Sequence, residues 1–314
     1  MPEDRILTGT DIDRAGPLIR RLAGSTALAA GRGIDPDSPE GITLAADRLE
    51  HILKKGEVEA IGHVGPDGLN GLMLWSPLSW DTAVTGVDCA RILLLGGEGC
   101  GSLCAFWKET ALGRGIRYAT ARLPDSSSEY GRQCDALAGT GFSELEKIVY
   151  LKAECGEVED VEGVDIAGPE DIGELREIAR VSYSFDRFHA DPVFDRQTAD
   201  KVHEEWMRGS FEGRADAVLA LRSAGGRPAG FCTVIIPGPD DPGAGWIDML
   251  AVRPDERGHG LGARLVTGAL DYLHDSGVDQ AALCTQADNR PALALYEKLG
   301  FTRFLTAATW RFAR

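Results

Sequence analysis

A glycine-rich segment, Arg257-Gly-His-Gly-Leu-Gly262, lies where an apolar stretch gives way to helical spacing, and its residue types suit anion binding. Glycine adopts positive φ angles and lets backbone amides approach a ligand closely. The first turn of a helix adds unpaired N–H donors and the positive end of the helix dipole, so phosphate is the natural ligand. A plain strand-to-helix turn is the alternative, and Pro254 and Arg257 upstream favour the phosphate site over it.

The spacing of these glycines does not match two other phosphate-binding motifs. In a dinucleotide-binding unit the glycines follow the first strand, whereas three strands are expected before this turn. A Walker loop requires Gly-Lys followed by Ser or Thr, and no such sequence follows Gly262.

Two segments in order resemble the GNAT (Gcn5-related N-acetyltransferase) superfamily. The segment Val252-x-Pro-x-x-Arg-Gly-x-Gly-x-Gly262 resembles its acetyl-CoA pyrophosphate loop, in which Arg257, Gly260 and Gly262 fill the pattern Gln/Arg-x-x-Gly-x-Gly/Ala. Downstream, Asn289 to Phe301 is similar to the family's Asn-x-x-Ala-x-x-x-Tyr-x-x-x-Gly-Phe helix. The resemblance covers about Val164 to Arg314 and implies an acyltransferase that uses acetyl-CoA.

The resemblance also implies roles for the matching residues. Pantetheine binding, with polarisation of the thioester carbonyl, falls to the backbone of Leu250, Ala251 and Val252. Pyrophosphate binding falls to the amides of Arg257, Gly258, His259, Gly260, Leu261 and Gly262. Asn289 is expected to contact the pantetheine or the reacting region, and Tyr296 is expected to protonate the departing CoA thiolate. The alternative for Tyr296 is a core aromatic on an amphipathic helix, and no metal is expected.

The acetyl acceptor is not fixed by this superfamily. The stretch Ser184 to Pro192, followed by Glu205 to Phe211, is similar to nucleotide-sugar N-acetyltransferases of the dTDP-fucosamine acetyltransferase type. The resemblance of this sequence to those enzymes implies direct transfer of acetyl to the primary amine of a small molecule, with a nucleotide-linked amino sugar as the best guess. Alternatives are another small amine, a protein or peptide amine, and a non-catalytic acyl-CoA-binding protein. Tandem GNAT chains also include mycothiol synthases, whose length fits although no specific motif matches.

The stretch from Phe185 to Phe194 offers groups for such an acceptor. Aromatic faces can stack on a base or sugar, and Arg187 can bind a diphosphate. Equally, the aromatics can cover the core while Arg187 pairs with Asp186 or Asp191. The amine must lose a proton before attack, and no spacing distinguishes the four candidate bases, His189, Asp191, Glu205 and Asp248.

Periodicity and turn residues predict the elements that hold these groups. From residue 166 onward the order is two helices, three strands, helix, strand, helix, strand, and the order strand, glycine turn, helix, strand, helix, Gly-Phe, strand recurs before residue 154. We therefore expect an α/β tandem GNAT-like fold, with a mixed, mostly antiparallel sheet flanked by helices in each half. The expected parts are a degenerate GNAT-like domain (1–153), an acidic linker (154–165) and a catalytic domain (166–314).

The glycine turn of the first half, Leu95 to Gly101, differs from its counterpart. Glu98 places a negative charge where a pyrophosphate would lie, and no Asn-to-Tyr pairing follows, although Tyr130 is nearby. A structural or substrate-shaping role is therefore favoured over a second active site.

Charge and composition limit the classes of molecule that the protein is expected to bind. The formal net charge of −16 argues against nucleic-acid and anionic-membrane binding. Residues 251–314 nevertheless hold eight basic and seven acidic residues, which leaves room for an anionic cosubstrate. The cysteines have no zinc spacing, no apolar run is long enough for a membrane span, and the N-terminus does not resemble a secretion signal. We expect a cytoplasmic protein with reduced thiols, and the oligomeric state, including a homodimer, is left open.

Overall fold

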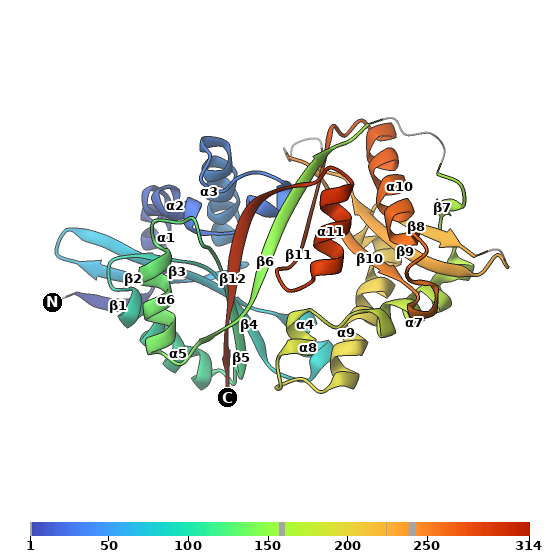
Figure 1. Cartoon of the computed structure of the whole chain (residues 1–314). Helices are drawn as coiled ribbons and strands as arrows, with labels where there is room; N and C mark the ends of the chain where they lie inside the picture. Colours follow the sequence, from blue (N-terminus) through green and yellow to red (C-terminus); the bar gives the residue numbers. More distant parts are fainter. Residues whose placement is uncertain (1, 157–160, 224, 239–242) are drawn as a thin grey trace. The chain divides into compact units, whose positions relative to one another are not determined.

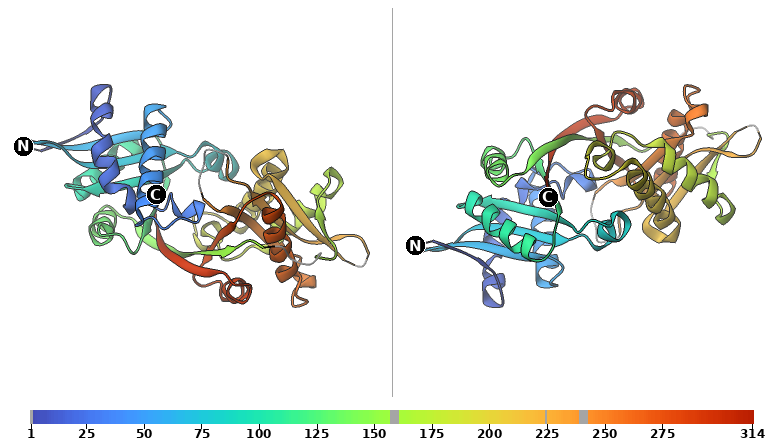
Figure 2. Two further views of the ribbon diagram at one scale, coloured as in Figure 1. Left: turned by 90° about the horizontal axis from the view of Figure 1, so that it is seen from above. Right: turned by 90° about the horizontal axis from the view of Figure 1, so that it is seen from below.

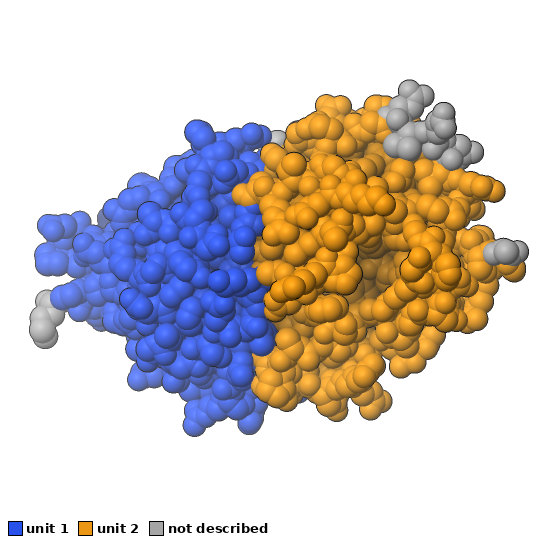
Figure 3. All heavy atoms as spheres, in the orientation of Figure 1, with its two compact units in different colours: residues 1–30, 34–147, 305–314 blue, residues 31–33, 148–304 orange. Residues whose placement is uncertain are grey.

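In the computed structural model, the chain forms two compact units (Figure 3). The structure describes residues 2–156, 161–223, 225–238 and 243–314. Unit 1 is made of Met1–Ala30, Ile34–Lys147 and Leu305–Arg314, and unit 2 of Gly31–Gly33 and Ile148–Phe304. Each unit has a mixed, mostly antiparallel sheet with helices on its faces, which confirms the expected fold class.

The sheet of unit 1 has the strand order β1-β2-β3-β4-β5-β12, with β4 and β5 parallel and the neighbours β1/β2, β2/β3, β3/β4 and β5/β12 antiparallel. The strands are β1 (Glu3–Ile6), β2 (Glu59–Gly65), β3 (Gly68–Pro77), β4 (Cys89–Gly97), β5 (Tyr118–Pro124) and β12 (Thr302–Ala313). The α-helices are α1 (Thr10–Arg14), α2 (Gly16–Leu22), α3 (Pro39–Lys54), α4 (Ser79–Thr85), α5 (Cys100–Gly113) and α6 (Tyr130–Gly139).

The strand β3 explains how helices come to cover both faces of this sheet. Its residues Leu72 to Trp75 are all buried, and successive side chains of a strand point to opposite faces. Leu72 and Leu74 join the apolar cluster of α2 and α3, whereas Met73 and Trp75 join that of α5. Figure 2 shows the blue helices α2 and α3 in front of this sheet from above and the teal helix α5 in front from below.

The sheet of unit 2 has the order β6-β11-β10-β9-β8-β7, with β10 and β11 parallel. Its strands are β6 (Ser143–Glu154), β7 (Val164–Ile166), β8 (Ala217–Arg222), β9 (Pro228–Ile235), β10 (Gly245–Val252) and β11 (Gln280–Gln286). The α-helices are α7 (Ile172–Ser182), α8 (Arg187–Ala190), α9 (Arg196–Gly209), α10 (Leu261–Asp275) and α11 (Arg290–Lys298) (Figure 1). The helices α10 and α11 belong to one apolar cluster on the sheet, and α7 and α9 to another.

Each sheet contains part of a strand from the other half of the sequence. Residues 148–154 of β6 pair with β11 in unit 2, and residues 307–313 of β12 pair with β5 in unit 1. The units therefore differ from the expected halves 1–153 and 166–314, because periodicity locates a strand without saying which neighbour it pairs with. The expected linker 154–165 includes residues 157–160, which lie outside the described residues.

The elements of the repeated order are found within a few residues of their expected positions. The first strand, the helices α1 to α4 and the short strand β7 were not among the elements expected from the sequence. Among the described residues, no helix combines the length and apolarity needed to cross a membrane.

Candidate active site

The strands β10 and β11 separate soon after they begin. Gly245 pairs with Ala281 and Trp246 with Ala282, and no later pair joins these two strands in the described part of the chain. On its other edge, β10 stays paired with β9 as far as Val252. The surface of unit 2 is hollowed in the region of β10 (Figure 3). The second half of β10 therefore has one backbone edge that no strand covers.

The peptide groups of Leu250 and Val252 face this open edge. The amide of Arg253 donates to Ala229 of β9 at 2.8 Å, and peptide directions alternate along a strand, so Leu250 and Val252 point away from β9 while Ala251 points toward it. The carbonyl of Leu250 accepts a hydrogen bond from the Tyr183 hydroxyl at 3.2 Å. The amides of Leu250 and Val252 are thus donors on the open edge, as a pantetheine arm would require.

The loop from β10 to α10 uses its glycines in two ways. Gly258 and Gly260 have φ angles of 84° and 77°, and a Cβ at either would meet nothing within 4 Å. They are needed for the left-handed backbone rather than for space. A Cβ at Gly262 would lie 3.3 Å from Leu295 Cδ2, so this glycine allows α10 to pack closely against α11.

The amides of this loop form a group of free donors. In the part of the chain that the structure describes, no protein acceptor is bound by the amides of Arg257, Gly258, His259, Gly260, Leu261 and Gly262. Gly260 is the N-cap of α10 and supplies no side-chain cap, so the first turn keeps its donors and its positive dipole end. This arrangement suits a diphosphate.

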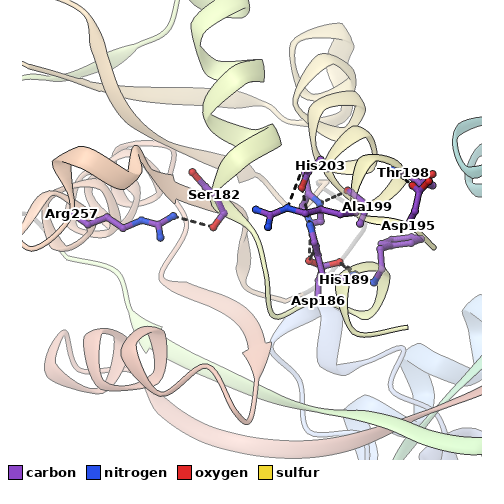
Figure 4. A network of polar contacts seen from close by, with 11 residues as sticks. Ser182, Asp186, His189, Asp195, Thr198, Ala199, His203 and Arg257 are labelled. Carbon is purple, nitrogen blue, oxygen red and sulfur yellow. Dashed lines mark hydrogen bonds and ion pairs between the residues drawn. The ribbon is translucent and has the colours of Figure 1, made fainter. Parts of the chain in front are cut away.

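Arg257 fixes the loop by its side chain. Its Nε donates to the Val252 carbonyl at 3.1 Å and its second guanidinium nitrogen donates to the Ser182 carbonyl at 3.0 Å (Figure 4). The guanidinium therefore joins the loop to the end of β10 and the end of α7. His259 is exposed, with Nδ1 3.3 Å from the Glu256 carbonyl, which agrees with a spacer whose amide matters more than its ring.

Tyr296 lies on α11 with its side chain buried beside Phe301, at a ring distance of 5.8 Å. Burial raises the pKa of Tyr296 above its usual value, and Cys232 and Cys284 raise it further. Burial also raises the pKa of Tyr183, and Tyr296 is the next cause, so the two phenols lie close together. Both hydroxyls stay protonated at neutral pH and can act as donors. Tyr183 was not among the site residues expected from the sequence.

Asn289 is the N-cap of α11. Its Oδ1 accepts from the Ala292 amide at 3.4 Å, and its Nδ2 donates to Thr285 Oγ1 at 3.0 Å. Its side chain thus starts the helix that carries Tyr296. Contact with the cosubstrate remains a prediction, and the N-cap role could have been predicted from Asn-x-Pro at the start of a helix.

Two of the phenylalanines expected to offer stacking faces lie in the core. Phe188 and Phe194 are buried with ring centroids 5.3 Å apart, and Phe188 also meets Trp206 at 5.8 Å. Arg187 lies over the Phe188 ring at 4.4 Å, and Phe185 is exposed. The structure therefore favours the core interpretation of these aromatics, with Phe185 left as an accessible face.

The four candidate bases already have partners. These partners are Asp186 and Asp200 for His189, the Val193 amide for Asp191, Arg176 and Arg208 for Glu205, and Arg214 for Asp248. Asp248 is the one of the four that lies on β10, and its charge is among the causes that raise the pKa of Tyr183.

The corresponding junction of unit 1, between β4 and α5, is filled by the unit's own side chains. The Gly97 amide donates to Glu129 Oε2 at 3.1 Å, and Gln133 Nε2 donates to the Leu95 carbonyl at 2.6 Å. A Cβ at Gly99 would lie 2.5 Å from the His63 ring. The sequence suggested Glu98 as the obstacle, whereas Glu129 and Gln133 come from the start of α6, more than 30 residues further along the chain.

Comparison with known proteins finds a family model that matches part of unit 2. Residues 174–301, which are less than half of the chain, match the sequence model of the acetyltransferase (GNAT) family. The matched segment contains the loop, Asn289, Tyr296 and the open edge of β10.

The other comparisons concern the fold of the whole chain and the name of a relative. A GCN5-related N-acetyltransferase from Sphaerobacter thermophilus has a TM-score of 0.64 and 17% identity over 99% of this chain and 95% of its own. A tandem GNAT protein from the clavulanic acid biosynthesis pathway has a TM-score of 0.55 and 17% identity over 100% of this chain and 98% of its own. These likenesses show the tandem GNAT fold alone.

Among curated relatives, mycothiol acetyltransferase of Pseudarthrobacter chlorophenolicus is 38% identical over 108 residues, which are 34% of this chain and 32% of the relative. The chain thus matches about a third of that relative's length, in contrast to the nearly complete coverage of the tandem structures.

Proposed function

We propose that the chain is an acetyl-CoA-dependent N-acetyltransferase that transfers the acetyl group directly to a primary amine of a small molecule, in the cytoplasm. The observation that carries the proposal is the junction between β10 and α10. There, free amides at the start of a helix adjoin a strand edge on which the amides of Leu250 and Val252 are not paired with a described strand. A diphosphate and the amide-bearing arm attached to it match these two sets of donors.

The proposed reaction assigns one step to each group of this site. The amine nitrogen attacks the thioester carbonyl carbon, a C–N bond forms, and the C–S bond breaks. The leaving thiolate takes the proton of Tyr296, a phenol that is protonated at neutral pH and can donate as charge develops on the sulfur. The attacking nitrogen loses a proton to water or to a side chain near β10, where Asp248 is the candidate on the strand itself. Tyr183 holds the Leu250 carbonyl and so steadies the strand edge.

Two acceptors deserve priority among small amines. The relative's name favours the free-amine form of mycothiol as the first acceptor to test. A nucleotide-linked amino sugar is the second, and burial of Phe188 and Phe194 removes part of the stacking surface on which that idea rested. A protein or peptide amine and a non-catalytic acyl-CoA-binding role are the remaining alternatives, and a homodimer is compatible with each of them.

The experiment is a turnover assay with purified protein, acetyl-CoA and an amine panel. The panel contains the free-amine form of mycothiol, dTDP- and UDP-amino sugars, simple amines and peptides with free N-termini. We expect release of CoA thiol and an N-acetyl product with one small-molecule class. Product from peptides alone would contradict the acceptor class. Tight acetyl-CoA binding without turnover on any amine would favour the non-catalytic alternative.

A further inference from the structure

A second cluster of reactive side chains lies in unit 2 around Asp186. Asp186 is the N-cap of α8, His189 lies in the same helix, and His203 lies in α9 (Figure 4). Asp186 Oδ2 is 2.5 Å from His189 Nδ1 and 3.5 Å from His203 Nε2. One ligand atom from each residue lies within 4.8 Å of the other two. Three groups that commonly bind transition metals therefore converge on one point.

The outer nitrogens of both histidines have acceptors of their own. His189 Nε2 is 3.0 Å from Asp200 Oδ1, and His203 Nδ1 is 3.0 Å from the Ala199 carbonyl. Each outer nitrogen is thereby set to carry the proton and to donate. Nε2 of His203 is then left with a lone pair that points toward Asp186, and loss of the proton in the hydrogen bond between His189 Nδ1 and Asp186 would leave a second one. Metal-binding histidines show this same pattern, with the second nitrogen donating to a carboxylate or a backbone carbonyl.

We propose that Asp186, His189 and His203 bind a divalent transition-metal ion such as Zn²⁺. Imidazole and carboxylate ligands suit Zn²⁺, and three protein ligands leave a fourth position for water. The site lies outside the segments assigned to acetyl-CoA. Its existence does not depend on the proposed function, because metal binding is measured directly. The expectation of no metal rested on cysteine spacing, which carries no information about this cluster.

The distances within the cluster show which ligand atoms must move apart when a metal ion binds. Ligand atoms of a tetrahedral zinc ion lie about 3.3 Å apart, given metal–ligand bonds of about 2.0 Å. The 3.5 Å separation of Asp186 Oδ2 and His203 Nε2 already fits. The 2.5 Å contact between Asp186 and His189 is that of a hydrogen bond, so the ion displaces a proton there and the two atoms separate by roughly 1 Å. Rotation of the two side chains on α8 supplies a shift of that size.

Burial and charge at the cluster favour a cation. The side chains of Asp186, His189 and His203 are 12%, 10% and 2% exposed. Asp200 adds a second carboxylate, and Arg196 Nε lies 3.9 Å from its other oxygen. Two carboxylates in a largely enclosed site need compensating positive charge, which a divalent ion supplies together with ligand bonds.

The neighbours of His203 suggest what the ion would stabilise. The His203 ring stacks on Tyr183 with centroids 4.2 Å apart and planes 16° from parallel. Tyr183 in turn donates to the Leu250 carbonyl at the open edge of β10. Bound metal would fix the ring beneath Tyr183, so the metal ligands are positioning residues rather than catalytic ones.

The test measures binding of Zn²⁺ and Co²⁺ to the metal-stripped, untagged full chain by calorimetry and by the visible absorption of Co²⁺. The wild type should bind one equivalent per chain. His189→Gln and His203→Phe should each lose this equivalent, and His203→Phe keeps a ring beneath Tyr183. Asp200→Asn removes an outer partner, so it should weaken binding about 10- to 100-fold. His63→Ala is the matched control, because His63 pairs with Asp4 at 2.6 Å, and it should bind metal like the wild type.

Two results would overturn the proposal. Absence of stoichiometric binding by the wild type would leave only an ion-pair network, and binding that persists in both histidine variants would place the metal elsewhere. Should the variants fail to fold, X-ray absorption of the Zn²⁺-loaded wild type decides. Two imidazole ligands with oxygen ligands support the site, whereas sulfur ligands would assign the metal to cysteines.

Discussion

The junctions between β4 and α5 in unit 1 and between β10 and α10 in unit 2 share one topology and differ in what their backbones are free to bind. In both, a strand paired with its antiparallel neighbour separates from a parallel partner and leads into a helix through glycines with positive φ angles. The connection is two residues long in unit 1, Glu98 and Gly99, and eight residues long in unit 2, residues 253–260. The longer loop is what adds a row of free amides.

Equivalent backbone groups have different partners at the two junctions. The amides of Glu98 and Arg253 both donate to the neighbouring strand, which aligns Gly97 with Val252 and Leu95 with Leu250. In unit 1 the Gly97 amide is bound by the Glu129 carboxylate, so an internal acceptor occupies the place where Val252 of unit 2 would bind the pantetheine arm. Topology alone therefore does not make a cosubstrate site, because the donors must also be left without an internal acceptor.

The later helices α6 in unit 1 and α11 in unit 2 show the same contrast. A Gly-Phe pair follows each helix, and the amides of Phe142 and Phe301 donate to the carbonyls of Leu137 and Tyr296, each at 3.0 Å. Leu137 thus occupies the position of Tyr296 and has no proton to give. In the described part of unit 1, the Gly97 amide is already bound and leucine stands at the position of the acid, which agrees with a structural or substrate-shaping role.

The largest expected effect comes from removing the acid of unit 2. Tyr296→Phe should lower kcat about 10²- to 10⁴-fold, the usual contribution of a positioned acid, and leave the Kd of acetyl-CoA nearly unchanged. Steady-state kinetics and calorimetry measure the two quantities. Tyr130→Phe is the control from the corresponding helix of unit 1, and it should keep the wild-type kcat. Wild-type turnover by Tyr296→Phe would show that the acid is another group.

The second effect concerns the free amides. Gly260→Glu should weaken acetyl-CoA binding about 10-fold or more, because a carboxylate would stand at the start of α10 and the left-handed backbone strains any side chain. Gly277→Glu is matched, since Gly277 has a φ of 78°, open space around it, and lies just beyond the other end of α10. Both variants should lose similar stability in urea unfolding, and Gly260→Glu alone should lose affinity. Equal affinities would place the diphosphate elsewhere.

The third effect tests whether the side chains that occupy the junction between β4 and α5 contribute to the stability of unit 1. Gln133→Leu leaves the buried Leu95 carbonyl without its donor, which should lower the free energy of unfolding by about 1–3 kcal/mol. The KM for acetyl-CoA should not change. Gln280→Leu removes an exposed hydrogen bond to Glu154 and should alter the unfolding free energy by about 0.5 kcal/mol or less. A raised KM in Gln133→Leu would mean that unit 1 takes part in cosubstrate binding.

These contrasts also separate what the sequence can reveal from what it cannot. Arg257, Gly260, Gly262 and Tyr296 could be proposed from the sequence, because the motifs that they match depend on local spacing at a strand end, a helix start and one helix face. The repeated order of elements predicted the tandem fold for the same reason.

The contacts that distinguish the junctions are tertiary. Glu129 and Tyr183 reach their backbone partners from 32 and 67 residues away, and no spacing rule connects them. The same holds for His203 and Asp186, which come together only when α9 packs against α8, and for the strand ends of β6 and β12 that complete sheets in the other unit.

The smallest expected effect uses a thiol as a probe of the filled junction. Cys100 is the first residue of α5, a position that commonly lowers a thiol pKa. Here burial, followed by the charge of Glu129, raises the pKa of Cys100 to about 11. Because the thiolate is the nucleophile, alkylation should be slow at pH 8 and should accelerate as the pH approaches that pKa.

Glu129→Gln keeps an oxygen for the Gly97 amide and removes the charge, so alkylation of Cys100 at pH 8 should become a few-fold faster while burial still limits it. Iodoacetamide labelling followed by mass spectrometry of the Cys100 peptide measures the rate. Glu144→Gln is the control, because the Glu144 charge acts on the pKa of Cys134 instead. An unchanged Cys100 rate in Glu129→Gln would mean that the carboxylate does not lie at this junction in solution, and the contrast between the two junctions would then rest on loop length alone.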